Sequence, residues 1–166
     1  MIAPPLANSI CIECGARVPS EFKSCDVFIV SLMGHPRLKS APRPNRLAID
    51  AFALQHPKRW CKSAKSYAGH LTGLCCGIEF SGSEKVHHAI QKWLSTSADN
   101  LGLLRPEEPK LRGQLTVEHV SQASDPNEFD YRVSEWATCL WTAYTSQHDI
   151  ARAWVNQALS QRTTRA

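Results

Sequence analysis

The sequence lacks any long hydrophobic run, and no stretch approaches the ~20 apolar residues that a helix needs to span a bilayer. Its start, Met-Ile-Ala-Pro-Pro-Leu-Ala-Asn, has neither the basic segment nor the long apolar segment of a secretory signal. The sequence also lacks a Ser/His/Asp order, a glycine-rich phosphate loop and a His-Glu-x-x-His pattern. We therefore expect a cytoplasmic protein with no membrane partner, and no motif assigns it to a known class of enzyme.

The composition is that of an ordinary globular domain. The chain has 166 residues, of which 43% are hydrophobic and 20% are charged, and this length can bury a hydrophobic core. Its seven cysteines are an odd number, and in a reducing compartment we expect thiols or metal ligands rather than disulfides. We expect a flexible arm over residues 1–10, a single helical domain over 11–160 and a frayed tail over 161–166.

Three cysteines near the start are the most informative feature. Cys11 and Cys14 lie in Cys-Ile-Glu-Cys-Gly-Ala, and Cys25 follows eleven residues after the second of them. The glycine lets the backbone turn tightly behind the second sulfur, so a Cys-x-x-Cys-Gly turn aims two thiolates at one point. Cys25 is close enough to supply a third thiolate to a tetrahedral Zn²⁺. The spacing therefore predicts a zinc knuckle over residues 11–25.

The sequence leaves the fourth zinc ligand open. His56 lies in Leu-Gln-His-Pro, where Pro57 ends the preceding helix because a residue before proline disfavours helical geometry. Such a rigid break suits a ligand, although Cys61 and His35 compete with His56 for this position. A redox-active thiol pair is the other interpretation, but the βαβ pattern that it requires is missing. The metal ligands that we predict are Cys11, Cys14, Cys25 and His56.

Apolar residues recur with helical spacing along the chain, and no strand pattern is convincing. Proline, glycine and capping residues divide the pattern into helices over about 21–33, 45–55, 63–80, 83–94 and 117–123, followed by a long helix from Asp125. That last helix carries Tyr144 and His148 on one face, and the pattern leaves open whether it continues through Trp154. These features predict an all-α fold, a compact helical bundle with the zinc knuckle packed on it.

A second group of polar residues lies on three of the predicted helices. Asp50, His70 and His148 each lie near an apolar stripe, and inward-facing Asp and His side chains from facing helices can form a metal or acid–base site. These three are our candidate catalytic residues, and His56 would join them as a metal ligand if the knuckle did not use it. The alternative is that they are buried polar residues that bridge helices or bond to helix ends.

The positive charge is concentrated in one stretch. Residues 34–65 contain eight basic residues and one acid, which makes this stretch +7 against +4 for the whole chain. Such a patch could contact phosphates or an acidic partner, and a tryptophan among cations is typical of a nucleic-acid surface. The alternatives are a solvated surface and a tryptophan folded over the knuckle. The candidate partner-binding residues are Arg37, Lys39, Arg43, Arg46, Lys58, Arg59 and Trp60.

Several motifs occur in order over about residues 11–148. They are Cys-x-x-Cys-Gly-Ala, Asp-Ala-Phe-Ala-Leu-Gln-His-Pro, His-Leu-x-x-Leu, Gly-x-Leu-Thr-Val, and Trp-Ala-x-x-x-Trp-x-Ala with a closing histidine. This combination resembles an uncharacterised bacterial family, domain of unknown function 5946. Where that family typically has tyrosine and valine, this chain has Phe52 and Ile49. The resemblance implies no activity, and it adds weight to Cys11, Cys14, Cys25, Asp50, His56, His70 and His148.

These observations lead to three hypotheses. The first is a small cytoplasmic zinc-binding protein in which zinc is structural and which acts as a binding or interaction module. The second is a metal-dependent enzyme that acts on a small molecule through a pocket floored by Asp50, His70 and His148. The third is a nucleic-acid-binding protein that uses residues 34–65.

Overall fold

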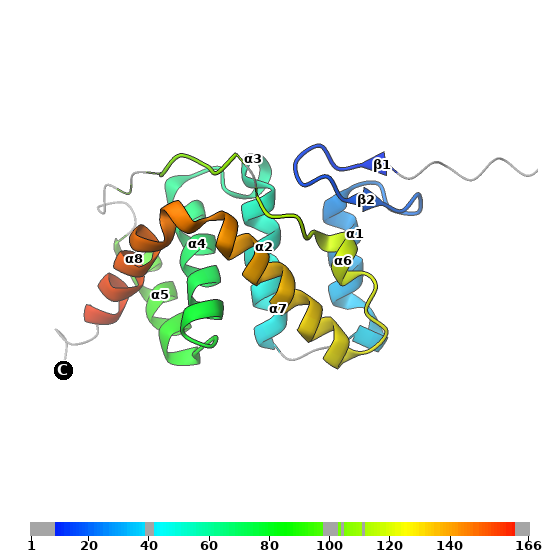
Figure 1. Ribbon diagram of the computed structural model, residues 1–166. Helices are drawn as coiled ribbons and strands as arrows, with labels where there is room; N and C mark the ends of the chain where they lie inside the picture. Colours follow the sequence, from blue (N-terminus) through cyan, green and yellow to red (C-terminus); the bar gives the residue numbers. More distant parts are fainter. Residues whose placement is uncertain (1–8, 39–41, 98–102, 104, 111, 162–166) are drawn as a thin grey trace, which may run out of the picture.

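The structure is a computed structural model that describes residues 9–38, 42–97, 103, 105–110 and 112–161. Figure 1 shows a body of helices with a small two-stranded hairpin at one end. In chain order the elements are β1 (Ser9–Ile10), β2 (Arg17–Val18), α1 (Cys25–Gly34), η1 (Pro36–Leu38), α2 (Pro42–Gln55), α3 (Pro57–Trp60), α4 (Ala64–Glu79), α5 (Glu84–Ser97), α6 (Val117–Val120), α7 (Pro126–Ala143), η2 (Thr145–Gln147) and α8 (His148–Ser160).

The body is made of α2, α4, α5, α7 and α8. α2 packs against α4 and α7, and α4 also packs against α5 and α8. Aromatic side chains fill the interior, and Tyr67, Trp93, Trp136 and Tyr144 are each fully buried. The predicted all-α helical bundle is confirmed. Among the residues that the structure describes, none of the helices combines the length and the apolar character that crossing a membrane requires.

The N-terminal part of the chain occupies one end of this body. The hairpin, α1 and α6 lie together there, and α5 and α8 form the opposite end (Figure 1). β1 and β2 pair antiparallel, with Ser9 opposite Val18 and Ile10 opposite Arg17. Ser9 and Ile10, which fall within the predicted arm, form strand β1, and this short hairpin has no convincing strand pattern in the sequence. Residues 1–8 of that arm and 162–166 of the predicted tail lie outside the described residues.

Capping side chains set the starts of three helices at positions that the sequence predicts. Ser63, Thr116 and Asp125 are the N-caps of α4, α6 and α7, and each accepts a hydrogen bond from a backbone N–H in the first turn. α1 differs from the prediction, because it begins at Cys25 instead of at residue 21. Its N-cap is Ser24, whose hydroxyl oxygen accepts from the Val27 N–H at 3.3 Å.

The predicted long last helix is broken after residue 143 into α7, η2 and α8. Tyr144 is fully buried at the break and donates its hydroxyl to the Leu54 carbonyl at 2.7 Å. Gln147 is also buried; it accepts from the Tyr67 hydroxyl at 2.6 Å and donates to the Glu107 carbonyl at 2.7 Å. These tertiary bonds hold the turn, so Tyr144 and His148 do not share one helical face.

α2 and α4 approach each other closely at two glycines. A Cβ at Gly77 would lie 2.5 Å from Leu47 Cδ1, and a Cβ at Gly73 would lie 2.2 Å from Asp50 Oδ2. Any side chain at either glycine would collide with α2. The two glycines therefore let α2, which ends at the knuckle, pack directly on α4.

Candidate metal centre

A tight turn places Cys11 and Cys14 side by side. The Gly15 N–H donates to the Cys11 carbonyl at 2.8 Å, and the Cys11 N–H donates to the Ala16 carbonyl at 2.9 Å. Gly15 has φ of +77°, a conformation that L side chains rarely adopt. The turn connects β1 to β2, and the antiparallel pairing of these strands holds the two ends of the turn together. The sequence interpretation of Cys-x-x-Cys-Gly as a thiol-converging turn is thus realised in the backbone.

Cys25 comes to the same point from α1. It is the first residue of that helix and is buried. The Ser24 cap holds the start of the helix, so the direction of the Cys25 side chain is set by the capped first turn. Cys14 Sγ and Cys25 Sγ lie 3.8 Å apart.

His56 completes the group from the end of α2. Its backbone N–H still bonds to the Phe52 carbonyl at 3.0 Å, and Pro57 begins α3 directly after it. The imidazole is fully buried and stacks on the Phe52 ring, with 3.9 Å between the centroids. Its Nδ1 lies 2.7 Å from the Phe52 carbonyl oxygen, which can only accept, so Nδ1 carries the proton. The lone pair of Nε2 therefore faces the cysteines, and Nε2 lies 3.3 Å from Cys11 Sγ.

The four donor atoms fit a tetrahedral metal ion. All of them lie within 4.8 Å of one another. Zn–S bonds of about 2.3 Å and a Zn–N bond of about 2.0 Å separate two sulfurs by roughly 3.8 Å and a sulfur from a nitrogen by roughly 3.5 Å. The observed separations of 3.8 Å and 3.3 Å are close to these values. Cys11, Cys14, Cys25 and His56 thus form a cluster that could hold a metal ion.

The thiols of Cys14 and Cys25 differ in the direction of their pKa shifts. The hydrogen bond from Cys25 lowers the pKa of Cys14 to about 4, against an opposing contribution from burial. The same contact, together with burial, raises the pKa of Cys25. One thiolate is thus favoured at neutral pH, and a bound cation would favour the others in the same way.

The two competing ligands lie elsewhere. Cys61 is fully buried, its thiol donates to the Ala53 carbonyl at 3.5 Å, and burial raises its pKa to about 12. His35 is exposed, and its Nδ1 accepts from the Arg37 N–H at 3.2 Å. Among the described residues, neither belongs to the cluster.

Side chains of α3 bond to residues of the knuckle and of α1, and these contacts link the knuckle to the helical body. Arg59 Nε donates to Glu13 Oε1 at 3.1 Å, and its guanidinium also pairs with Asp26. Trp60 Nε1 donates to Asp26 Oδ1 at 2.6 Å, and its ring meets Phe52 edge-on. Glu13 lies between Cys11 and Cys14 in the turn and Asp26 follows Cys25, so both ligand segments are held. No local pattern in the sequence marks these two acids as partners of α3.

The second predicted group is brought together only in part. His70 Nδ1 donates to Asp50 Oδ1 at 2.9 Å, which joins α4 to α2. Burial raises the pKa of Asp50, and the hydrogen bond from His70 opposes that shift. His148 does not join them, because its Nε2 donates to the Trp141 carbonyl at 2.8 Å and its ring stacks on Trp141.

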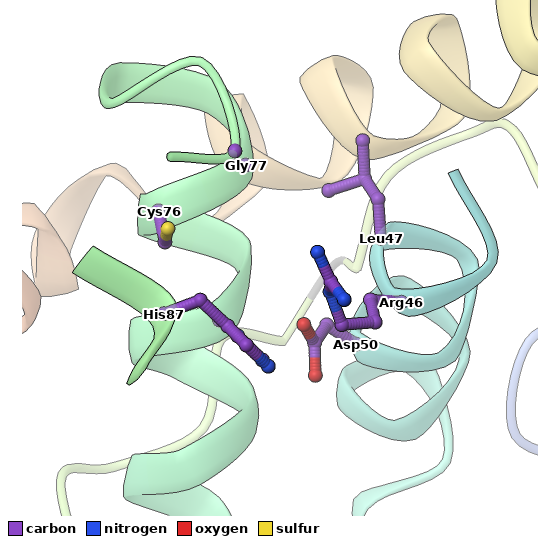
Figure 2. Close-up of a pocket in the computed structure, with 8 residues that line it drawn as sticks. Arg46, Leu47, Asp50, Cys76, Gly77 and His87 are labelled. Carbon is purple, nitrogen blue, oxygen red and sulfur yellow. The ribbon is translucent and has the colours of Figure 1, made fainter. Parts of the chain in front are cut away.

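A small cavity adjoins Asp50 on the side of α5. Figure 2 shows the His87 ring pointing toward the Asp50 carboxylate, with the Arg46 side chain beside it. Gly77 and Leu47 also line the cavity. The cavity has a volume of about 20 Å³, which is room for about one water molecule. Burial and the neighbouring Arg46 lower the pKa of His87, so this imidazole tends to be neutral. The described surface at Asp50 thus offers a polar contact between helices rather than a space of substrate size.

Two basic residues of the 34–65 stretch are paired with acids among the described residues. Arg46 pairs with Glu84, and Arg59 pairs with Glu13 and Asp26. Lys58 and Arg37 are exposed, and Trp60 Nε1 donates to Asp26 in the first turn of α1. Lys39 and the side chain of Arg43 lie outside the described residues. The stretch is therefore less positive at its surface than its composition suggests.

Comparison with known proteins gives a family and no activity. The model of the family described as "Family of unknown function (DUF5946)" matches residues 9–145. No curated protein and no solved structure matches the chain. The matched region contains the four cluster residues together with Asp50 and His70, and on this match the chain belongs to DUF5946, a family of unknown function.

Proposed function

We propose that this protein is a small zinc-binding protein in which zinc is structural and the knuckle acts as a binding module for a partner. The convergence of Cys11, Cys14, Cys25 and His56 within 4.8 Å is the observation that carries the proposal. Three thiolates and one imidazole in tetrahedral arrangement are a typical ligand set for zinc, and soft thiolates disfavour magnesium and calcium.

The ligand set favours a structural role over a catalytic one. Catalytic zinc sites keep one coordination position for water or substrate, whereas four protein ligands occupy all tetrahedral positions. The four residues also come from three separate places, namely the turn after β1, the start of α1 and the end of α2. Metal bound there would cross-link these segments, so its binding energy would become folding energy.

A thiolate-rich zinc site also agrees with the expected cytoplasmic location. Thiols persist in a reducing compartment. In an oxidising compartment the Sγ atoms of Cys14 and Cys25 would be prone to form a disulfide, because they lie 3.8 Å apart.

The enzyme hypothesis has less support from the described residues. It needs Asp50, His70 and His148 around a pocket, and His148 is bonded to Trp141 instead. The contact between His70 and Asp50 supports the alternative interpretation, a polar bridge between α2 and α4.

The experiment is metal analysis of the purified protein combined with thermal unfolding. We expect about one zinc per chain, and a large fall in Tm on treatment with a strong chelator. Cys14→Ser should lose the zinc, whereas Cys139→Ser should keep it. Cys139 is the matched control because its half-buried sulfur lies outside the cluster, where it accepts from the Gln114 N–H at 3.3 Å. Zinc retained at full affinity by Cys14→Ser would refute the proposal.

A further inference from the structure

An open groove runs along the surface of the knuckle. It lies between the turn after β1, the segment before α1 and the start of α3, and it encloses about 460 Å³. Two of the candidate metal ligands, Cys11 and Cys25, are part of its lining. The groove is therefore shaped by the same residues that would hold the metal.

Aliphatic side chains line the groove and are unusually exposed. Ile12 is 99% exposed and Ile10 is 67% exposed. Val18, which also lines the groove, is buried. Single exposed hydrophobic residues are common, but two isoleucines at one groove make a local apolar surface. Burying them against an apolar side chain of a partner would be favourable.

The rim of the groove is positively charged. Lys23 and Lys58 are exposed there, and the described residues provide neither with an ion-pair partner within 4.0 Å. Glu13 is the acid of the lining, and it is paired with Arg59. A ligand that enters between the lysines would therefore meet cations around an apolar floor.

We propose that this groove binds an extended peptide segment of a partner protein, in which a large apolar side chain is flanked by carboxylates. The apolar side chain would pack on Ile10 and Ile12, and the carboxylates would face Lys23 and Lys58. This inference rests on the proposed function, because the groove keeps its shape only while the knuckle is closed.

A peptide fits the groove better than a nucleic acid does. Binding of single strands relies on aromatic faces for stacking and on cations for phosphates. Trp60, the aromatic residue beside the groove, is turned to Phe52 and Asp26, and Arg59 is engaged by two acids. Exposed isoleucines offer no stacking surface to a single strand, whereas they can cover an apolar side chain of a peptide.

The test uses the zinc-loaded full chain and an array of short synthetic peptides. Each peptide carries one Leu, Ile, Phe or Trp in an acidic, a neutral or a basic background. We expect the acidic backgrounds with an apolar residue to bind most tightly. In fluorescence polarisation, Ile12→Ser and Lys58→Glu should each weaken that binding by roughly tenfold or more.

Matched controls exclude general effects of polarity and charge. Tyr131 on α7 is 63% exposed and Lys85 on α5 is exposed, and neither lines the groove. Tyr131→Ser and Lys85→Glu should therefore leave peptide binding unchanged. Zinc content is measured on the native protein and on every variant. A native protein without zinc would refute the proposed function, whereas a variant that keeps its zinc and loses the peptide tests the groove alone.

Several results would overturn the inference. A zinc-loaded protein that shows no preference for acidic apolar peptides contradicts it, as does binding that Ile12→Ser and Lys58→Glu do not weaken. Tighter binding of a single-stranded oligonucleotide at the groove would assign the surface to nucleic acid. Self-association that Ile12→Ser abolishes, measured by sedimentation, would assign it to a second copy of the chain.

Discussion

The His56 imidazole lies face to face with the Phe52 ring, and its Nδ1 donates to the Phe52 carbonyl at 2.7 Å. Phe52, one helical turn before His56, therefore sets the orientation of the His56 ring and determines which of its two nitrogens carries the proton. Such a hydrogen bond from the second ring nitrogen is the usual support of a metal-bound histidine. The arrangement leaves Nε2 free to face Cys11.

His56→Ala should lower zinc affinity by more than about 100-fold. Losing a group that hydrogen-bonds to a metal-bound histidine already lowers affinity by about 10–100-fold, and losing the histidine itself should cost more. Competition with a chromogenic chelator measures this affinity. His35→Ala is the control, since His35 is exposed and outside the cluster. Equal affinity in the His56→Ala variant and the native protein would mean that another group supplies the fourth ligand.

Gly73→Ala should destabilise the protein by about 1–3 kcal/mol, because its Cβ would lie 2.2 Å from Asp50 Oδ2 and force the carboxylate to move. Urea unfolding measures the change. Gly69→Ala is the matched control on the same helix: its Cβ would meet only Leu94 Cδ1, at 3.4 Å, so it should be neutral or stabilise by up to about 1 kcal/mol. Equal effects at the two glycines would contradict a close contact between α2 and α4 at Asp50.

Gln55→Leu should cost about 2–5 kcal/mol, because it leaves several buried groups without partners. Gln55 Nε2 donates to the Arg112 and Leu115 carbonyls, both at 2.8 Å, and Oε1 accepts from Trp136 Nε1 at 3.0 Å. Denaturant unfolding of Gln157→Leu, at an exposed position on α8, serves as the comparison and should change by less than about 0.5 kcal/mol. A Gln55→Leu variant as stable as the native protein would show that this network is dispensable.

Local chemistry explains what the sequence predicts well. The Cys-x-x-Cys-Gly turn needs only short-range geometry, and the Pro57 break places His56 at a helix end without reference to the rest of the fold. Capping by Ser63, Thr116 and Asp125 is equally local, and so is the alternation of helices and loops.

Contacts between distant segments explain what the sequence could not predict. The break at Tyr144 depends on a hydrogen bond to the Leu54 carbonyl, ninety positions away. The sequence around residue 144 contains no proline or glycine that would predict it. The choice of His56 over Cys61 and His35 depends on where α2 ends relative to α1. His148 lies against Trp141 because η2 turns the chain. Helical periodicity alone could not predict this turn, so it could not predict whether His148 lies beside Asp50.

Glu128 should make part of the stability of the protein depend on acid pH. Hydrogen bonds from the Ser124 hydroxyl and N–H lower the pKa of Glu128 to about 2. Because the folded pKa lies below the unfolded one, this contribution is present above about pH 4.3 and is lost as pH falls toward 2. The difference in Tm between the native protein and Glu128→Gln should therefore shrink from about pH 6 to about pH 3. A constant difference for Glu128→Gln between these two pH values would contradict the assignment.

X-ray absorption at the zinc edge of the purified protein tests the metal centre most directly. The Cys11, Cys14, Cys25 and His56 cluster predicts three sulfur neighbours at about 2.3 Å and one imidazole nitrogen at about 2.0 Å from a single zinc per chain. Protein without zinc, a first shell of oxygen and nitrogen only, or four sulfurs without nitrogen would contradict this account.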